Sequence, residues 1–220
     1  MILKILTTIM PWPIRRFLLQ KFFGFEIHST ARIGLSWVFP KKLIMEAQTR
    51  IDHFTVAVNL DLIHLDTNAT IGRKNWITGF PTQTDSLHFQ HQLDRKAELL
   101  LGESSAITKN HHIDCTNSIK IGKFSTIAGY NSQFLTHSIN VLKNIQDSAP
   151  IHIGDYTFVG TNSIILNGAC LPSFSVLGAK SLLNKKFETQ WTLYGGVPAK
   201  ALSDIPKTAK YFLRDEGFVN

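Results

Sequence analysis

The sequence predicts an all-β protein: a three-sided parallel β-helix with a short helical segment before it and a short helix after it. Aliphatic residues recur every six positions through much of the chain, Gly often follows them, and a small residue stands four places on. A period of six fits neither an α-helix nor one long strand, but it fits a short strand and a turn repeated many times. The 220 residues, 44% of them hydrophobic, suffice for one core without a second domain.

The longest unbroken series of repeats lies in the C-terminal half. Five hexads begin at Ile153, Val159, Ile165, Leu171 and Leu177, and their fifth positions hold Thr157, Ser163, Ala169, Ser175 and Ser181. We expect the aliphatic residues to point into a prism, the small residues to lie at its corners, and three hexads to form one coil. Stacked coils then pair parallel strands about 4.8 Å apart, and each coil covers the core of the next. Five such hexads argue against an ordinary β-sandwich, whereas a right-handed β-helix stays an alternative.

The first 25 residues differ in composition from the repeats. They are rich in Ile, Leu and Phe, and they carry four basic residues and no acid: Lys4, Arg15, Arg16 and Lys21. The longest uncharged run, 5–14, is far below the roughly 20 residues of a membrane-spanning helix, and no signal-peptide cleavage site follows. Two interpretations stay open. The segment is an interfacial helix pair on anionic lipid, anchored by Trp12, or it caps the open end of the core or packs on a sister subunit.

Cysteine content and charge restrict the environment and the partners. Two cysteines, Cys115 and Cys170, predict free thiols and a reducing compartment, so we expect a cytoplasmic protein that can lie on the inner face of the cytoplasmic membrane. The net charge of +7 suits a polyanionic partner, but a nucleic acid is not expected, because neither a basic stripe nor an aromatic platform is present.

Histidine spacing argues against a metal site. The adjacent His111 and His112 would point to opposite faces of a strand, so only one of them can reach a site. The other histidines outside the motif described below share no spacing typical of metal ligands: His28, His53, His64, His88, His91 and His152.

Three segments break the six-residue period and are expected to leave the prism as loops: roughly 79–98, 138–150, and the tail from about 184. Breaks in a regular scaffold are where functional residues tend to lie. In the tail, Ser203 and Asp204 precede Pro206 in an arrangement typical of a helix start. We therefore divide the chain into an N-terminal helical segment (1–25), a β-helix domain (26–202) and a helical tail (203–220).

A Thr-His pair, Thr136-His137, precedes the second break, and the chain returns from it as Pro-Ile-His-Ile-Gly at 150–154. An alcohol attacks a thioester slowly unless a base takes its proton, and imidazole is the usual base near neutral pH. This arrangement resembles the hexapeptide-repeat acyltransferases, in particular the maltose and galactoside O-acetyltransferases and the acetyltransferases of polysaccharide biosynthesis. The resemblance implies a left-handed β-helix, a homotrimer, direct transfer from acetyl-CoA without a metal, and His137 as the general base.

The second ring nitrogen of His137 also needs a hydrogen-bond acceptor, which orients the imidazole. Gln146, Asp147 or a backbone carbonyl are the candidates within the break, and the sequence does not choose among them. A backbone N–H is the expected oxyanion donor. By the same resemblance, three residues are predicted to contact the acceptor: Asn110, Asp114 and Asn131.

The CoA side of the predicted site lies after the catalytic break. Residues 196–200 read Gly-Val-Pro-Ala-Lys, which resembles the element that lies beside the CoA tail in this family and assigns Pro198 and Lys200 to it. Lys180 is a second candidate cation for the CoA phosphates. Four small turn residues would let the pantetheine arm approach the backbone: Gly160, Thr161, Gly178 and Ala179.

The expected function is acetyl-CoA-dependent O-acetylation of a sugar hydroxyl in cell-surface polysaccharide biosynthesis. Three alternatives stay open: N-acetylation of a nucleotide-linked amino sugar, acetylation of an antibiotic, and a catalytically silent β-helix that serves as a binding scaffold.

Overall fold

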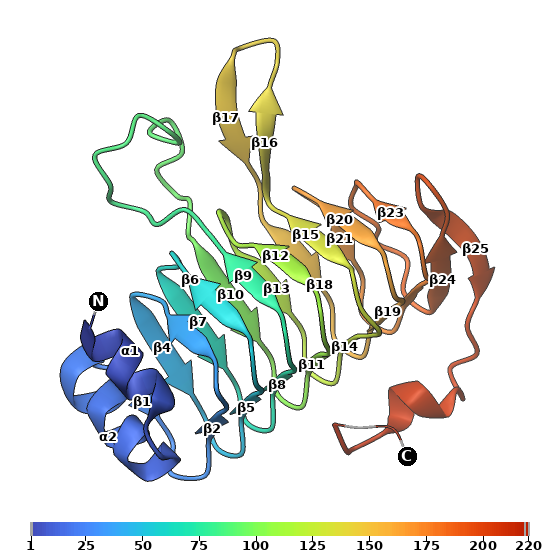
Figure 1. Ribbon diagram of the computed structural model, residues 1–220. Helices are drawn as coiled ribbons and strands as arrows, with labels where there is room; N and C mark the ends of the chain where they lie inside the picture. Colours follow the sequence, from blue (N-terminus) through green and yellow to red (C-terminus); the bar gives the residue numbers. More distant parts are fainter. Residues whose placement is uncertain (1, 218, 220) are drawn as a thin grey trace.

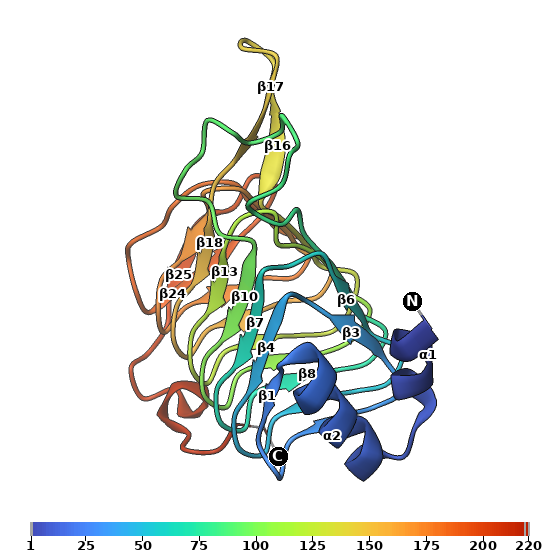
Figure 2. The same cartoon turned by 90° about the vertical axis from the view of Figure 1, so that its left-hand side faces the viewer.

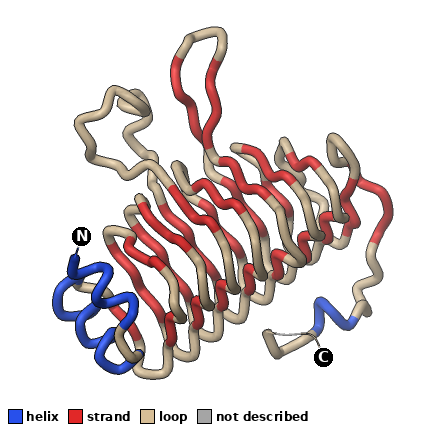
Figure 3. Tube along the Cα trace, in the orientation of Figure 1, coloured by secondary structure: helices blue, strands red, loops and turns tan. Residues whose placement is uncertain are grey.

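The computed structural model describes residues 2–217 and 219, and it shows three parallel sheets that form the walls of a prism (Figures 1 and 3). The first sheet contains β1 (Glu26–Ile27), β4 (Lys42–Met45), β7 (Leu62–Leu65), β10 (Glu98–Leu101), β13 (Ile119–Ile121), β18 (Ile151–Ile153) and β21 (Cys170–Leu171). The second contains β2 (Arg32–Ile33), β5 (Arg50–Ile51), β8 (Thr70–Ile71), β11 (Ala106–Ile107), β14 (Thr126–Ile127), β19 (Phe158–Val159), β22 (Val176–Leu177), β24 (Thr192–Gly195) and β25 (Lys200–Asp204). The third contains β3 (Trp37–Phe39), β6 (Val56–Val58), β9 (Trp76–Thr78), β12 (His112–Asp114), β15 (Gln133–Leu135), β20 (Ile164–Leu166) and β23 (Leu182–Leu183).

The aliphatic residues of the hexads form the core, as predicted. Ile121, Ile153 and Leu171 stand in register in the first sheet, and each is at most 1% exposed. The small residues of the fifth positions are buried beside them at the ends of the strands. The Ser163 hydroxyl, for example, donates to the carbonyl oxygen of Gly160 at 2.9 Å, which satisfies a turn carbonyl that the sheets leave unpaired.

The turns from the second sheet to the third sheet share one backbone conformation, and we call this edge the second corner. Asn110, Asn131 and Lys180 occupy it with φ between 55° and 59°. Left-handed backbone is accessible to Asn at low cost, which explains why Asn recurs there. Gly160 lies at the same corner, where a Cβ would stand 2.5 Å from the backbone nitrogen of Ala179, so the stacking of two coils requires glycine.

The C-terminal part differs from the sequence prediction in two ways. The chain leaves the prism after β23 but returns to it, because β24 pairs in parallel with β22. The predicted helix start at Ser203 is wrong, because β25 runs antiparallel to β24 through Asp204. Among the described residues that follow, the only helical element is a 3₁₀ turn, η1 (Lys210–Leu213). Hydrogen bonding across the sheet edge outweighs the local helix signal here. The end of the predicted 203–220 tail, positions 218 and 220, lies outside the described residues, as does position 1 of the N-terminal segment.

Two helices, α1 (Ile2–Ile9) and α2 (Trp12–Phe23), lie at the N-terminal end of the prism (Figure 2). Leu19 of α2 is fully buried in the core, and the Arg15 guanidinium donates to the carbonyl oxygens of Gly34 at 2.6 Å and Ser36 at 2.7 Å. Helix α2 therefore closes the open end, as one of the two interpretations expects. Within residues 2–217 and 219, no helix is long and apolar enough to cross a membrane.

The two cysteines are free thiols. Cys115 is buried and Cys170 is half-buried. Burial raises the pKa of the Cys115 thiol well above its usual value, so this group is an inert part of the core.

Candidate active site

Two insertions project from one edge of the prism, where the third sheet turns into the first sheet of the next coil; we call this edge the insertion corner (Figure 1). Residues 79–97 form a loop between β9 and β10. A hairpin of β16 (His137–Asn140) and β17 (Ile145–Ser148) lies between β15 and β18. Strand β12, which pairs with both β9 and β15, ends between the two insertions.

His137 begins the hairpin, and its Nδ1 lies 2.7 Å from Oδ2 of Asp114 at the end of β12. Asp114 is in register with Leu135, so the stacking of two coils places the carboxylate beside the histidine that follows β15 by two residues. The side chain of His137 is 42% exposed, whereas that of Asp114 is 14% exposed. The Asp114 carboxylate, which accepts the hydrogen bond, is therefore mostly buried, whereas the His137 imidazole is open to solvent.

Two threonines hold the Asp114 carboxylate. Oδ1 accepts from the backbone N–H of Thr116 at 3.1 Å and from its hydroxyl at 2.7 Å. Oδ2 accepts from the backbone N–H of Thr136 at 3.1 Å. Burial alone would raise the pKa of Asp114, but hydrogen bonds from His137 and Thr116 outweigh it and lower the pKa below the usual value. Asp114 is therefore ionised at neutral pH and is only an acceptor.

An ionised Asp114 fixes the tautomer of His137. Nδ1 must carry the proton that it donates to the carboxylate, which leaves the lone pair of Nε2 free to accept a proton. The hydrogen bond to Asp114 raises the pKa of His137 against the opposing effect of burial. This geometry suits a general base, because the imidazolium that forms on proton transfer is stabilised by the carboxylate.

The structure corrects the prediction of which group accepts the hydrogen bond from the second ring nitrogen of His137. Asp114, not Gln146, Asp147 or a backbone carbonyl, occupies this position. Asp147 instead accepts from the side-chain amide of Gln92 at 2.8 Å. Asp114 was predicted to contact the acceptor molecule, but its oxygens are engaged by Thr116, Thr136 and His137.

The loop 79–97 supports His137 from its other side. The Phe89 ring meets the imidazole edge-on, with centroids 6.1 Å apart and an interplanar angle of 87°. The Arg95 guanidinium lies 4.8 Å from the Phe89 centroid and donates to the carbonyl oxygen of Thr116 at 2.6 Å. The sequence did not identify Phe89 or Arg95, since neither stands in a repeat or in a recognised motif.

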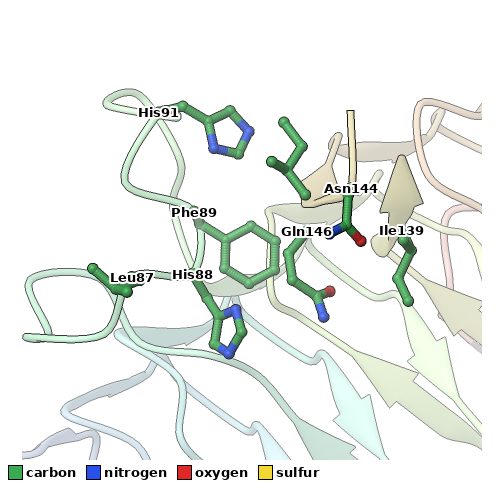
Figure 4. A pocket seen from close by; sticks show the side chains of 8 residues that line it. Leu87, His88, Phe89, His91, Ile139, Asn144 and Gln146 are labelled. Atoms are coloured by element: carbon green, nitrogen blue, oxygen red, sulfur yellow. The ribbon is translucent and has the colours of Figure 1, made fainter. Parts of the chain in front are cut away.

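A cavity of about 370 Å³ separates the loop from the hairpin (Figure 4). The Phe89 ring points across it toward Gln146 and Ile139. The remaining lining residues are Leu87, His88, His91, Asn144 and Ile145. A molecule that entered this cavity would lie beside the ring that contacts His137, so the cavity is a candidate acceptor pocket.

The residues predicted for CoA gather at one edge. Gly160 and Thr161 follow β19, Gly178, Ala179 and Lys180 follow β22, and Pro198 and Lys200 follow β24, so all lie at or next to the second corner of consecutive coils. Asn110 and Asn131 occupy the same corner, where the backbone N–H of Asn131 donates to the carbonyl oxygen of Asn110 at 2.9 Å.

His137 is at the opposite end of the third sheet from this corner. Five residues lie between Asn131 and His137, three of them in β15, and a chain of this length spans at most about 20 Å. The described chain therefore does not bring Asn110 or Asn131 to its own His137, and their contact with an acceptor stays a prediction.

His111 and His112 point to opposite faces, as their adjacency predicts: His111 is fully buried and His112 is exposed. Nδ1 of His111 accepts from the backbone N–H of Ser132 at 3.1 Å, and Nε2 lies 3.0 Å from the Thr108 hydroxyl. Burial lowers the pKa of His111 to about 4. This histidine is a neutral core residue. In the described part of the chain, residues 2–217 and 219, no group of three or more His, Cys, Asp or Glu could hold a metal ion.

The burial of neutral His111 predicts a pH-dependent stability. A histidine in the unfolded chain takes up a proton near pH 6.5, whereas folded His111 does so only near pH 4, so stability is lost as pH falls between these values. We expect the free energy of unfolding to fall by about 2 kcal/mol from pH 7 to pH 5 because of His111. Urea unfolding of wild type and His111→Gln at both pH values measures the difference. His112→Gln is the matched control, and an equal loss in His111→Gln and wild type would refute the assignment.

The comparison with solved structures finds proteins of similar fold, whereas the two sequence comparisons find no match. No protein-family model matches the chain, and no curated protein matches its sequence. Among solved structures, the polysialic acid O-acetyltransferase OatWY is similar with a TM-score of 0.62 and 15% identity, over 82% of this chain and 84% of that one. A hexapeptide transferase family protein from Anaplasma phagocytophilum is 22% identical, with a TM-score of 0.46 over 86% and 82% of the two chains. A hexapeptide-repeat acetyltransferase from Vibrio cholerae is 20% identical, with a TM-score of 0.47 over 93% and 88%. The predicted left-handed parallel β-helix is confirmed.

Proposed function

We propose that this chain is an acetyl-CoA-dependent O-acetyltransferase that acts on a sugar hydroxyl in the synthesis of a cell-surface polysaccharide. The observation that carries the proposal is the His137–Asp114 pair, 2.7 Å apart, at the root of a hairpin that projects from a β-helix. The fold shared with a polysialic acid O-acetyltransferase and the resemblance of the Thr-His segment to sugar O-acetyltransferases support the same chemistry.

In the proposed mechanism, Nε2 of His137 accepts the proton of the acceptor hydroxyl while the hydroxyl oxygen attacks the thioester carbonyl carbon. Asp114 keeps Nδ1 protonated and stabilises the imidazolium. His137 then returns the proton to the sulfur as the carbon–sulfur bond breaks. The products are the acetyl ester and CoA, and the base regains its starting state.

The proposed CoA face is the second corner. Half-buried Gly178 and exposed Ala179 leave the backbone accessible, and Lys180 and Lys200 offer cations to the CoA phosphates. The prediction of CoA contact at Gly160 is not supported, because Gly160 is buried against Ala179 of the next coil. Because His137 lies at the opposite end of the third sheet from this corner in the same chain, we propose that a groove between adjacent prisms of a homotrimer joins one subunit's His137 to the next subunit's second corner. Analytical ultracentrifugation measures the oligomeric state, and a monomer would contradict this arrangement.

The proposed localisation is the inner face of the cytoplasmic membrane. Free thiols are typical of a reducing compartment, and the apolar residues that α1 exposes favour a peripheral position at a membrane.

The test of the proposed function is CoA release from acetyl-CoA by the full chain, over mono-, di- and nucleotide-linked sugars and an amino sugar. Turnover with a sugar hydroxyl supports O-acetylation, whereas turnover only with the amine supports the N-acetyltransferase alternative. If the chain shows no turnover and also binds no acetyl-CoA in isothermal titration calorimetry, the enzymatic function is overturned and a silent scaffold is favoured.

A further inference from the structure

The helix pair at the N-terminal end exposes large apolar side chains over a continuous stretch of chain. In α1, Ile2, Ile5 and Ile9 are 76%, 49% and 67% exposed, and this spacing places them on one helical face. In α2, Phe17 and Phe22 are 58% and 54% exposed. Closing the prism does not require these residues, because α2 buries Leu19 and Arg15 for that purpose.

Cations accompany the apolar side chains on the helices. The Lys21 ammonium lies 5.5 Å from the Phe17 centroid and 5.8 Å from the Phe22 centroid. Lys4 and Arg16 add two further basic groups, and the helices contain no acidic residue. Aromatic and aliphatic groups beside unopposed cations are typical of a surface that contacts an anionic membrane.

A basic groove adjoins α2. A cavity of about 470 Å³ is lined by Trp12 and by three arginines of successive coils, Arg32, Arg50 and Arg73. Only Arg50 has a carboxylate partner in the groove, Asp52 at 3.0 Å. A guanidinium binds phosphate oxygens with two parallel hydrogen bonds, so this groove suits phosphate groups.

We propose that α1, the outer face of α2 and the arginine groove form one membrane-docking face that binds anionic phospholipid. The apolar residues enter the acyl boundary, while the arginines hold headgroup phosphates. A second copy of the chain fits this face poorly, because an isologous contact would place two surfaces that carry Lys4, Arg16 and Lys21 and no acidic residue of the helices against each other. This inference develops the proposed localisation and does not depend on the proposed acetyl transfer.

Vesicle sedimentation of the full chain tests the proposal. We expect binding to vesicles that contain phosphatidylglycerol, weak binding to phosphatidylcholine alone, and release at high salt. Ile9→Glu combined with Phe17→Glu should weaken binding roughly tenfold or more, and Arg32→Glu with Arg73→Glu should weaken it by about fivefold for each lost cation. All four side chains lie on the surface, and unchanged urea unfolding would show that the variants fold.

Two matched controls lie elsewhere on the molecule. Leu93→Glu replaces an apolar side chain that is 93% exposed in the loop 79–97, and Lys207→Glu reverses a charge near the C-terminus; both should bind vesicles like wild type. Equal binding to neutral and anionic vesicles, or no binding to either, would overturn the proposal. A change of oligomeric state in Ile9→Glu without vesicle binding would likewise overturn it and assign the face to a second copy.

Discussion

Replacing His137 by Ala is expected to lower kcat for acetyl transfer by about 10³-fold, within the range that a positioned general base contributes. In the proposed mechanism, Nε2 of His137 accepts the hydroxyl proton, and the hydrogen bond to Asp114 gives the imidazole the required tautomer. The KM for acetyl-CoA should change little, because the predicted CoA residues lie at the second corner. Steady-state release of CoA thiol with the best acceptor of the sugar panel measures both constants.

His28→Ala is the matched control for this prediction. His28 is exposed near the N-terminal end of the prism, where its Nδ1 contacts the Thr30 hydroxyl at 2.9 Å, so its loss should leave kcat unchanged. If His137→Ala retains kcat within about tenfold, a range below that of general-base catalysis, His137 is not the base. Partial rescue of His137→Ala by added imidazole would support the assignment.

Asp114→Asn is expected to lower kcat by about 10²-fold or more and to move the acidic limb of the pH profile to lower pH. Asp114 raises the pKa of His137, so we expect the wild-type protein to lose activity as pH falls through this raised value and His137 becomes protonated. Asparagine removes the charge, and protonation of His137 then occurs at a lower pH. The pH dependence of kcat/KM in wild type and variant measures the shift.

Asp147→Asn is the control for a carboxylate of the same region. Asp147 accepts from Gln92 and not from His137, so the acidic limb should stay in place. If Asp114→Asn loses activity but the acidic limb of its pH profile stays in place, Asp114 has no electrostatic effect on His137. Its role is then only to accept the hydrogen bonds from Thr116 and Thr136. Urea unfolding of the variant separates this outcome from misfolding.

The repeats carry most of the information about the fold. The hexads from Ile153 to Leu177 predict the core residues because each wall reuses the same strand and turn. The six-residue period does not predict β24, because the interruption at 184–191 removes the phase of the repeats. Only the pairing of β24 with β22 shows that Leu193 returns to the second sheet. The helix expected at Ser203 fails for a related reason, since strand pairing across the sheet edge is not visible in local sequence.

The candidate site could be predicted only where it is local in sequence. His137 follows from the Thr-His segment, whereas the partner Asp114 lies 23 residues earlier. Three extra residues, two between Ile113 and Ile121 and one between Ile127 and Phe134, shift the six-residue phase and hide the register that brings the two together. Phe89 and Arg95 lie in a loop without periodicity, so no sequence pattern places them beside a histidine that is more than 40 residues away.

Both insertions leave the prism from the insertion corner, one coil before and one coil after the strand that supplies Asp114. Residues added or removed at this corner do not alter the spacing of the stacked strands, because the chain re-enters the first sheet in the register of the coil below. The loop and the hairpin can therefore diverge in length and sequence while the prism is conserved. Under the proposed function, in which the cavity between the insertions binds the acceptor, acceptor choice and structural stability are separable, and we expect that grafting either insertion onto another β-helix changes the acceptor.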